Sequence, residues 1–363
     1  MIKYTDTLMW KEINETPKVF SGIISNNDDT ITKIVEEIKN RKITNIYAVA
    51  RGTSDHALIY FKYAVEIMCG MPVALGASSI VTLYNGAINL KDSLVLGCSQ
   101  SGKAVDVLEI IKKANSQNGL TVTVTNDTES PMAKESKYHI YCGAGVEKSV
   151  AATKTFSAQL YALLLLAAKM SGNTNIEANL KNLDKKIALD IPNIDLMSSK
   201  YSTKYQSMKS GFVLSRGVTY SIALEATLKL QETSYIQMKG YATSDFFHGP
   251  MAMVNETTPV IIYAPRYNFT DKSLAENFFN DEMKGIDKML SLKAPVLIVT
   301  DDKKINEKYK NICDTALIPE SENEFFSMFN FAIFAQMFAC KISCAIGNNP
   351  DSPRALNKVT ITK

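Results

Sequence analysis

The chain repeats its own order of strands and turns, and this repeat constrains the fold more than any other feature. When the sequence is shifted by 165 residues, three elements of the first half fall on matching elements of the second half. The aligned pairs are Arg51-Gly52 with Arg216-Gly217, Ser78-Ser79 with Thr243-Ser244, and Leu94-Val95 with Pro259-Val260. Few residues are identical, but a shared register across three elements indicates a duplicated structural unit.

Short apolar runs alternate with helical patterns in each half, which is typical of βαβ units and a parallel sheet. In the first half the pattern predicts strands at 46–50, 94–98 and 121–125, and helices at 56–68, 104–114 and 155–170. The second half has strands at 211–214, 260–263 and 296–299. We therefore predict an α/β fold of two tandem doubly wound domains, each a parallel sheet flanked by helices in the flavodoxin-like manner.

The length of 363 residues suits two domains of roughly 150 residues each. We expect an N-terminal helical segment at 1–30, a first domain at 31–175, a second domain at 200–345 and a C-terminal tail at 346–363. A polar stretch from Ser171 to Lys209, rich in Asn and Lys, would hold a linker near 175–205.

Charge and composition exclude several classes of function. The 40 basic and 37 acidic residues are spread along the chain. No concentration of basic residues therefore indicates binding to nucleic acid or to a membrane surface. No signal sequence is evident, and the apolar stretch near Tyr161–Ala168 is far shorter than the roughly 20 residues of a membrane helix. Six cysteines without framework spacing indicate a reducing cytoplasm. Cys340 and Cys344 favour core packing over metal binding, so we expect neither a metal nor a cofactor.

Two turns of the first half end neighbouring predicted strands, where ligands bind in open parallel sheets. They are Arg51-Gly52-Thr53-Ser54 and Ser99-Gln100-Ser101-Gly102. The second turn offers two hydroxyls and an amide to phosphate oxygens, Gly102 lets the backbone come close, and a helix beginning near Lys103 adds its positive end. Taken alone, this turn fits a helix cap equally well. Ser54, at the same place after the preceding strand, favours a phosphate cradle.

Together with four further motifs, these turns resemble the sugar isomerase (SIS) domain family, and the whole series resembles the isomerase half of glucosamine-6-phosphate synthases from about residue 45 onward. The further motifs are Val150-Ala151-Ala152-Thr153-Lys154, the run from Ala223 to Glu232, His248-Gly249-Pro250, and the tail from Asn349 to Lys358. Several motifs in the same order are far more specific than any one of them.

The resemblance implies a role for each matching residue. Glu232 would move a proton between C1 and C2 with help from Lys229, His248 would open the sugar ring in the neighbouring subunit's site, and Lys358 would form a Schiff base with the open-chain ketose. The implied phosphate and sugar contacts are Ser54, Ser99, Gln100 and Ser101, together with Gly52, Thr53, Gly102, Val150 and Ala151. Ala104 departs from the pattern, because the synthase has a threonine there, so one phosphate hydrogen bond is expected to be lost or replaced.

These roles agree with the chemistry of aldose–ketose interconversion. Histidine titrates near neutrality and suits ring opening. Lys229 and Glu232, three residues apart, share a helix face, and a lysine amine can condense with a carbonyl. Each residue also has a structural alternative: a solvated ion pair for Lys229 and Glu232, a turn cap for His248, and a disordered tail for Lys358.

Three polar residues outside these motifs favour structural roles over chemistry. His56 and His139 are expected to support the fold. Arg216, the repeat partner of Arg51, is expected to tie strand ends together.

The chain lacks the glutaminase half of the synthase, so a stand-alone deaminase is the expected function. The stretches from Glu147 to Lys154 and from Ala355 to Thr360 are similar to SIS-type glucosamine-6-phosphate deaminases and fructosamine-6-phosphate deglycases. We expect conversion of glucosamine 6-phosphate to fructose 6-phosphate and ammonia, in a homodimer with shared sites. A deglycase or a plain phosphosugar isomerase remains an alternative. A sugar-phosphate sensor is disfavoured, because binding alone requires none of Glu232, His248 and Lys358.

Overall fold

The computed structural model describes residues 2–358, which form two compact units. The N-unit contains Glu15–Lys148, Ala152–Lys186 and the tail from Leu356 onward. The C-unit contains the residues up to Asn14, the short piece Ser149–Ala151, and Ile187–Ala355.

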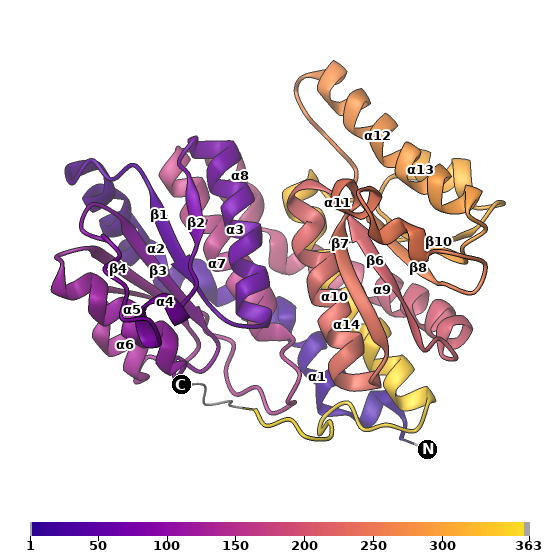
Figure 1. The fold of residues 1–363 in the computed structure, drawn as a ribbon, viewed down its shortest axis with the longest axis horizontal. Helices are drawn as coiled ribbons and strands as arrows, with labels where there is room; N and C mark the ends of the chain where they lie inside the picture. Colours follow the sequence, from indigo (N-terminus) through magenta and orange to yellow (C-terminus); the bar gives the residue numbers. More distant parts are fainter. Residues whose placement is uncertain (1, 359–363) are drawn as a thin grey trace. The chain divides into compact units, whose positions relative to one another are not determined.

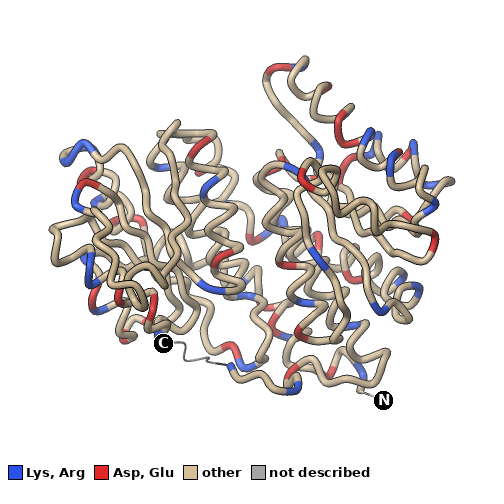
Figure 2. The backbone as a smooth tube through the Cα atoms, viewed as in Figure 1, with Lys and Arg blue, Asp and Glu red and all other residues tan. Residues whose placement is uncertain are grey.

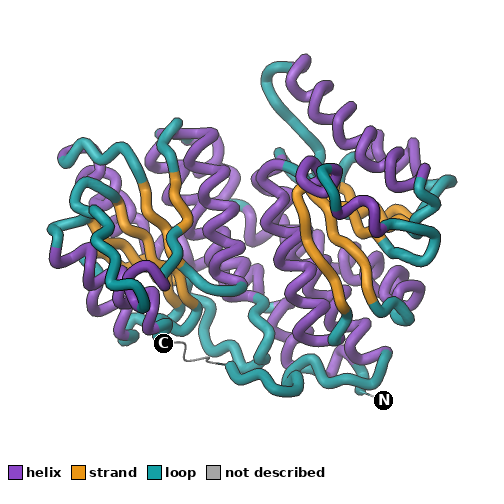
Figure 3. The backbone as a smooth tube through the Cα atoms, viewed as in Figure 1, coloured by secondary structure: helices purple, strands orange, loops and turns teal. Residues whose placement is uncertain are grey.

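The N-unit is built on five parallel strands with helices on both sheet faces (Figures 1 and 3). The strands lie in the order β2-β1-β3-β4-β5, and Ile46 of β1 pairs with Val73 of β2 and Leu94 of β3. All residues of β3 and β4 are buried, as expected for central strands covered on both faces. The strands are β1 (Ile46–Val49), β2 (Val73–Leu75), β3 (Leu94–Ser99), β4 (Leu120–Thr125) and β5 (Tyr138–Tyr141).

The helices of the N-unit bury its sheet. Helix α7 is buried from Lys154 to Ala168 and packs against α2 and α3, which explains its almost uninterrupted apolar sequence. The helices are α2 (Thr16–Asn40), α3 (Thr53–Cys69), α4 (Ser79–Thr82), α5 (Val105–Ser116), α6 (Pro131–Glu135), α7 (Lys154–Ser171) and α8 (Thr174–Leu180).

The C-unit has a second parallel sheet, in the order β10-β9-β8-β6-β7. Its strands are β6 (Ser210–Ser215), β7 (Gln237–Ala242), β8 (Val260–Ala264), β9 (Val296–Thr300) and β10 (Asp314–Leu317). Its short helices are η1 (Tyr4–Asp6), α1 (Leu8–Asn14), η2 (Gly217–Thr219), α11 (Thr243–Phe247), η3 (Pro250–Met253) and α13 (Lys303–Tyr309). Its longer helices are α10 (Tyr220–Ser234), α12 (Lys272–Ser291) and α14 (Glu324–Ala345), and α9 (Leu183–Tyr205) begins in the N-unit and continues here.

The two sheets have the same strand order when each is counted from its own first strand, so the predicted duplication and flavodoxin-like fold are confirmed. The aligned glycines Gly52 and Gly217 both have a positive φ, of 54° and 62°, after the first strand of each sheet. The shared left-handed turn explains why glycine is found at both positions.

The stretch near 175–205, where a linker was expected, contains helices α8 and α9. The helix after the Ser99–Gly102 turn begins at Val105, within two residues of its predicted start.

Helix α14 is long and apolar enough to span a membrane by length and composition alone, with a mean hydropathy of 1.4 over its most apolar window. That window is entirely buried within the structure, and α14 packs along α10. Its packing therefore accounts for its composition. Acidic and basic residues are interspersed along the backbone of both units (Figure 2).

Candidate functional site

The Ser99–Gly102 turn holds itself in a tight, left-handed shape at the end of β3. The Gly102 amide donates to Ser99 Oγ at 3.2 Å, and Gly102 has a φ of 64°. A Cβ atom on Gly102 would lie 2.1 Å from Ser130 Oγ, so any side chain would force the turn open. Glycine is therefore required here both by the backbone conformation and by the close approach of Ser130.

The hydroxyls of this turn do not cap helix α5. The N-cap residue of α5 is Ala104, which has no side-chain cap, and Ser101 Oγ instead accepts from the Lys103 amide at 3.3 Å. Helix α5 thus begins at Val105, four residues after Ser101, without a side-chain cap from its N-cap residue. This arrangement favours the phosphate cradle over the helix-cap alternative.

Ser54 is the second residue of helix α3, which begins just after the turn that follows β1 at the same sheet edge. Strands β1 and β3 are adjacent and parallel, with Val49 opposite Gly97, so the turns that follow them share the carboxyl edge. The order of the strands reverses between β1 and β3, which is where open α/β sheets bind ligands. Ser54 is 6% exposed, and its Oγ accepts from Gln159 Nε2 at 3.0 Å.

The paired arginines of the repeat act as structural ties. Arg51, after β1, pairs through Nε with Asp106 of α5 at 2.5 Å. Arg216, after β6, pairs with Asp281 of α12, which is the helix that follows the equivalent third strand. The structural role expected for Arg216 agrees with this contact.

The phosphate cradle is not repeated in the C-unit. The residues aligned with Ser99-Gln100-Ser101-Gly102 are Ala264-Pro265-Arg266-Tyr267. The Arg266 amide donates to Asp301 at 2.7 Å, and a tyrosine takes the place of the left-handed glycine. Only the N-unit therefore keeps the hydroxyl-lined turn at this edge, among the residues that the structure describes.

Helix α10 holds a buried charge cluster. Lys229 is fully buried, and its Nζ lies 2.7 Å from Glu232 Oε2 and 3.3 Å from Glu225 Oε1. Burial by itself lowers the pKa of Lys229, but the two carboxylates raise it overall, so the lysine stays charged. The Glu232 side chain is 23% exposed and can meet a ligand. A solvated surface pair is excluded, because Lys229 has no exposure to solvent.

The other predicted residues are distributed over both units. His248 follows α11, and its side chain is exposed. Val150 and Ala151 belong to the C-unit, where the Val150 amide donates to the Asp351 carbonyl at 3.2 Å. His139 bonds Thr125 Oγ1 through Nε2 at 2.8 Å, which agrees with the structural role expected for it.

Lys358 lies within the N-unit and is paired with an acid that the sequence patterns did not single out. Its Nζ is 2.7 Å from Oε2 of Glu147, a carboxylate with no exposure to solvent.

The other residue that the sequence analysis missed is Glu225, whose fully buried side chain pairs with Lys229. Its position four residues before Lys229 was the available signal, since i and i+4 residues face each other on a helix.

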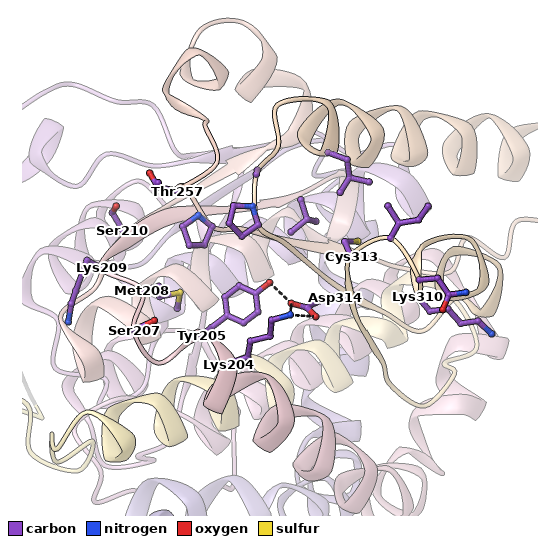
Figure 4. A pocket seen from close by; sticks show the side chains of 17 residues that line it. Lys204, Tyr205, Ser207, Met208, Lys209, Ser210, Thr257, Lys310, Cys313 and Asp314 are labelled. Carbon is purple, nitrogen blue, oxygen red and sulfur yellow. Dashed lines mark hydrogen bonds and ion pairs between the residues drawn. The ribbon is translucent and has the colours of Figure 1, made fainter.

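A hollow of about 780 Å³ lies elsewhere, at the amino edge of the C-unit sheet (Figure 4). Ser210, Val296 and Asp314, which begin β6, β9 and β10, contribute to its wall. Asp314 is neutralised there by Lys204 at 2.7 Å and accepts from the Tyr205 hydroxyl at 2.9 Å. This hollow is on the edge opposite the strand ends that bind ligands, so we do not assign the substrate to it.

Comparison with known proteins decides the family. Residues 37–169 and 204–345 match the SIS domain, once in each half of the repeat. The chain belongs to the SIS domain family. Among the described residues, no group of three or more His, Cys, Asp or Glu side chains is placed to hold a metal ion.

Curated relatives of this SIS protein include two glutamine–fructose-6-phosphate aminotransferases (isomerizing). The protein of Clostridium tetani is 31% identical over 97% of this chain and 58% of its own length. The protein of Aquifex aeolicus is 32% identical over 98% of this chain and 57% of its own length. The chain thus spans somewhat more than half the length of these relatives.

Solved SIS structures cover nearly the whole chain. The C-terminal domain of glucosamine-fructose-6-phosphate aminotransferase from Francisella tularensis has a TM-score of 0.83 at 26% identity, covering 96% of this chain and 98% of its own. Glucosamine-6-phosphate deaminase from Thermotoga maritima has a TM-score of 0.75 at 23% identity, covering 98% of this chain and 100% of its own. At that identity, the likeness to the deaminase shows the fold alone.

The Gly102→Ala substitution tests the cradle. Alanine brings both left-handed strain and the contact with Ser130, so we expect the turn to deform and KM for a sugar phosphate to rise roughly tenfold or more. Gly70→Ala is the matched control, because Gly70 has a φ of 62° but open space around its Cβ position. The Gly70→Ala variant should carry similar backbone strain and leave KM unchanged. If Gly102→Ala had the same KM as wild type, the Ser99–Gly102 turn would not be part of the binding site.

Proposed function

We propose that this SIS protein is a phosphosugar aldose–ketose isomerase and deaminase that converts glucosamine 6-phosphate and water to fructose 6-phosphate and ammonia. The observation that carries the proposal is the α10 cluster, in which the buried Lys229 fixes the partly exposed carboxylate of Glu232. Family membership, the aminotransferase (isomerizing) relatives and the phosphate turn of the N-unit support it.

In the proposed reaction each residue has one task. The Ser99–Gly102 turn and Ser54 bind the phosphate, and His248 transfers the proton that opens the ring. Glu232 takes the C2 proton and delivers it to C1, which turns the 2-amino aldose into a 2-imine of the ketose. The Lys358 amine then forms a bond to C2 as ammonia leaves, and water releases the ketone and regenerates the lysine.

Product analysis tests this function. Wild-type protein with glucosamine 6-phosphate should release ammonia and fructose 6-phosphate in equal amounts. In a parallel assay with a fructosamine 6-phosphate as substrate, release of the amine would identify a deglycase. Exchange of solvent deuterium into C1 of fructose 6-phosphate measures the proton transfer alone. Exchange without ammonia would reduce the proposal to a plain isomerase. If neither deuterium exchange nor product were detected, an enzymatic function would be contradicted.

The exposed His248 allows a test of site sharing between subunits. If His248 acts in a neighbouring subunit's site, mixing inactive Glu232→Gln chains with inactive His248→Ala chains should restore activity. Random mixing into dimers leaves one intact site in half of the molecules, so we expect recovery of roughly a quarter of wild-type turnover, provided that each dimer has two independent sites. Activity that stays at the level of the separate variants would place His248 and Glu232 in the same subunit's site.

A further inference from the structure

Glu147 is a buried carboxylate whose two oxygens are fixed by the start of helix α7. Its Oε1 accepts from the Thr153 amide at 2.9 Å and from the Thr155 amide at 3.1 Å. Its Oε2 accepts from Thr155 Oγ1 at 2.7 Å. These bonds use the amides that a helix N-terminus leaves free, so the carboxylate has a fixed position.

The tail lysine is held by this fixed carboxylate. Lys358 Nζ lies 2.7 Å from Glu147 Oε2, although the two residues are 211 positions apart. The Lys358 side chain is 24% exposed, whereas that of Glu147 is fully buried. The contact therefore anchors the tail and leaves part of the lysine side chain accessible.

Electrostatics keep Glu147 ionised. Burial alone would raise the pKa of its carboxyl, but Lys358 and the hydrogen bonds from Thr153 and Thr155 bring the pKa below its ordinary value. The nearby Cys142 thiol is neutral, because burial first and Glu147 second raise its pKa to about 12.

Lys154, which is close to Glu147 in the sequence, bonds to other groups. Lys154 bonds the Val146 carbonyl at 2.8 Å and Glu15 at 2.6 Å. Lys358 is thus the cation whose ammonium nitrogen meets the Glu147 carboxylate.

We propose that Glu147 is a positioning residue, which holds the Lys358 nitrogen in place for a ketose phosphate. The inference rests on the proposed imine chemistry of Lys358. For that step the ammonium releases a proton to water, the amine forms a bond to C2 of the ketose, and the carbonyl oxygen leaves as water. Glu147 orients the amine and does not bond to the substrate.

Reductive trapping separates this inference from the proposed function. Protein incubated with fructose 6-phosphate and borohydride over a range of pH should give a secondary amine, which peptide mass spectrometry maps to Lys358. In Glu147→Gln the trapping rate at its optimum should fall about 10²-fold through misplacement of the amine. The KM for fructose 6-phosphate in the same assay should change little, because Glu147 does not bond to the substrate.

Two further variants keep the test sharp. Thr155→Val removes the hydroxyl that holds Glu147 Oε2 but leaves the charge, so trapping should slow without a change in KM. Glu15→Gln is the matched control, since it makes the same change at another lysine pair of the N-unit, where the glutamate side chain is 51% exposed. It should leave both the trapping rate and KM unchanged. Should Glu147→Gln fail to fold, a Thr155→Val chain that traps at the wild-type rate would overturn the proposal.

The possible failures point to different conclusions. Trapping by wild type at another lysine, or no trapping at all, would overturn the imine role of Lys358 within the proposed function. Trapping at Lys358 with an unchanged rate in Glu147→Gln would overturn the positioning role of Glu147 and leave the proposed function standing.

Discussion

Glu232→Gln should lower kcat for ketose formation from glucosamine 6-phosphate by about 10²–10⁴-fold, which is the usual contribution of one positioned acid–base group. The amide keeps the size of the side chain but cannot accept the C2 proton. Lys229 retains Glu225 at 3.3 Å, so the helix should keep its charge pairing. Because the Glu232 side chain is 23% exposed and the buried Lys229 keeps Glu225, the substitution should cost little stability and the variant should fold.

Two measurements separate a chemical from a structural effect in this variant. Deuterium exchange into C1 of fructose 6-phosphate should fall in parallel with kcat, whereas the melting temperature and the affinity for the phosphosugar should change little. Glu256→Gln, on an exposed loop of the C-unit, is the control and should behave as wild type. Undiminished exchange in Glu232→Gln would assign the proton transfer to another group.

The central strands were predictable because burial on both faces leaves a continuous apolar run. Strands β8 and β9 are buried at every position, and the sequence predicted both almost to the residue. The edge strand β7 was missed, because Gln237 and Lys239 are exposed and its pattern is mixed. Edge strands of this kind carry no pattern that distinguishes them from loops.

Helix α9 was hidden by its composition. Its apolar positions Ile187, Ile191 and Ile194 are buried and recur at helical spacing, but the surrounding Asn, Lys and Asp residues and Pro192 suggested a linker. A proline at an exposed position of a long helix can be tolerated when the remaining turns pack well. The local sequence does not contain that information.

The candidate site was predictable where motifs are local and unpredictable where contacts are distant. The spacing of Lys229 and Glu232 predicted a shared helix face, but not that Lys229 is fully buried. The pairing of Glu147 with Lys358 joins residues 211 positions apart, and no periodicity links them. Side-chain burial and long-range ion pairs depend on tertiary packing, which a single sequence does not record.

Lys229→Met should be the most destabilising single substitution that we predict, because it leaves a buried carboxylate without its cation. Glu225 and Lys229 both have fully buried side chains, 3.3 Å apart. Removing one partner of such a pair costs about 3–5 kcal/mol, since the remaining charge keeps its desolvation penalty. For a unit of this size the melting temperature should fall by roughly 6–20 °C.

A double variant tests whether loss of the Lys229 cation beside Glu225 is the cause. Glu225→Gln combined with Lys229→Met replaces the ion pair by neutral groups of similar volume, and it should recover most of the lost stability. Lys204→Met makes the same change at a lysine that is 63% exposed, where the effect should stay within about 0.5 kcal/mol. If the melting temperature of Lys229→Met stayed within about 2 °C of wild type, Glu225 would not depend on Lys229 for its charge. The conclusion that this cluster fixes Glu232 would then be wrong.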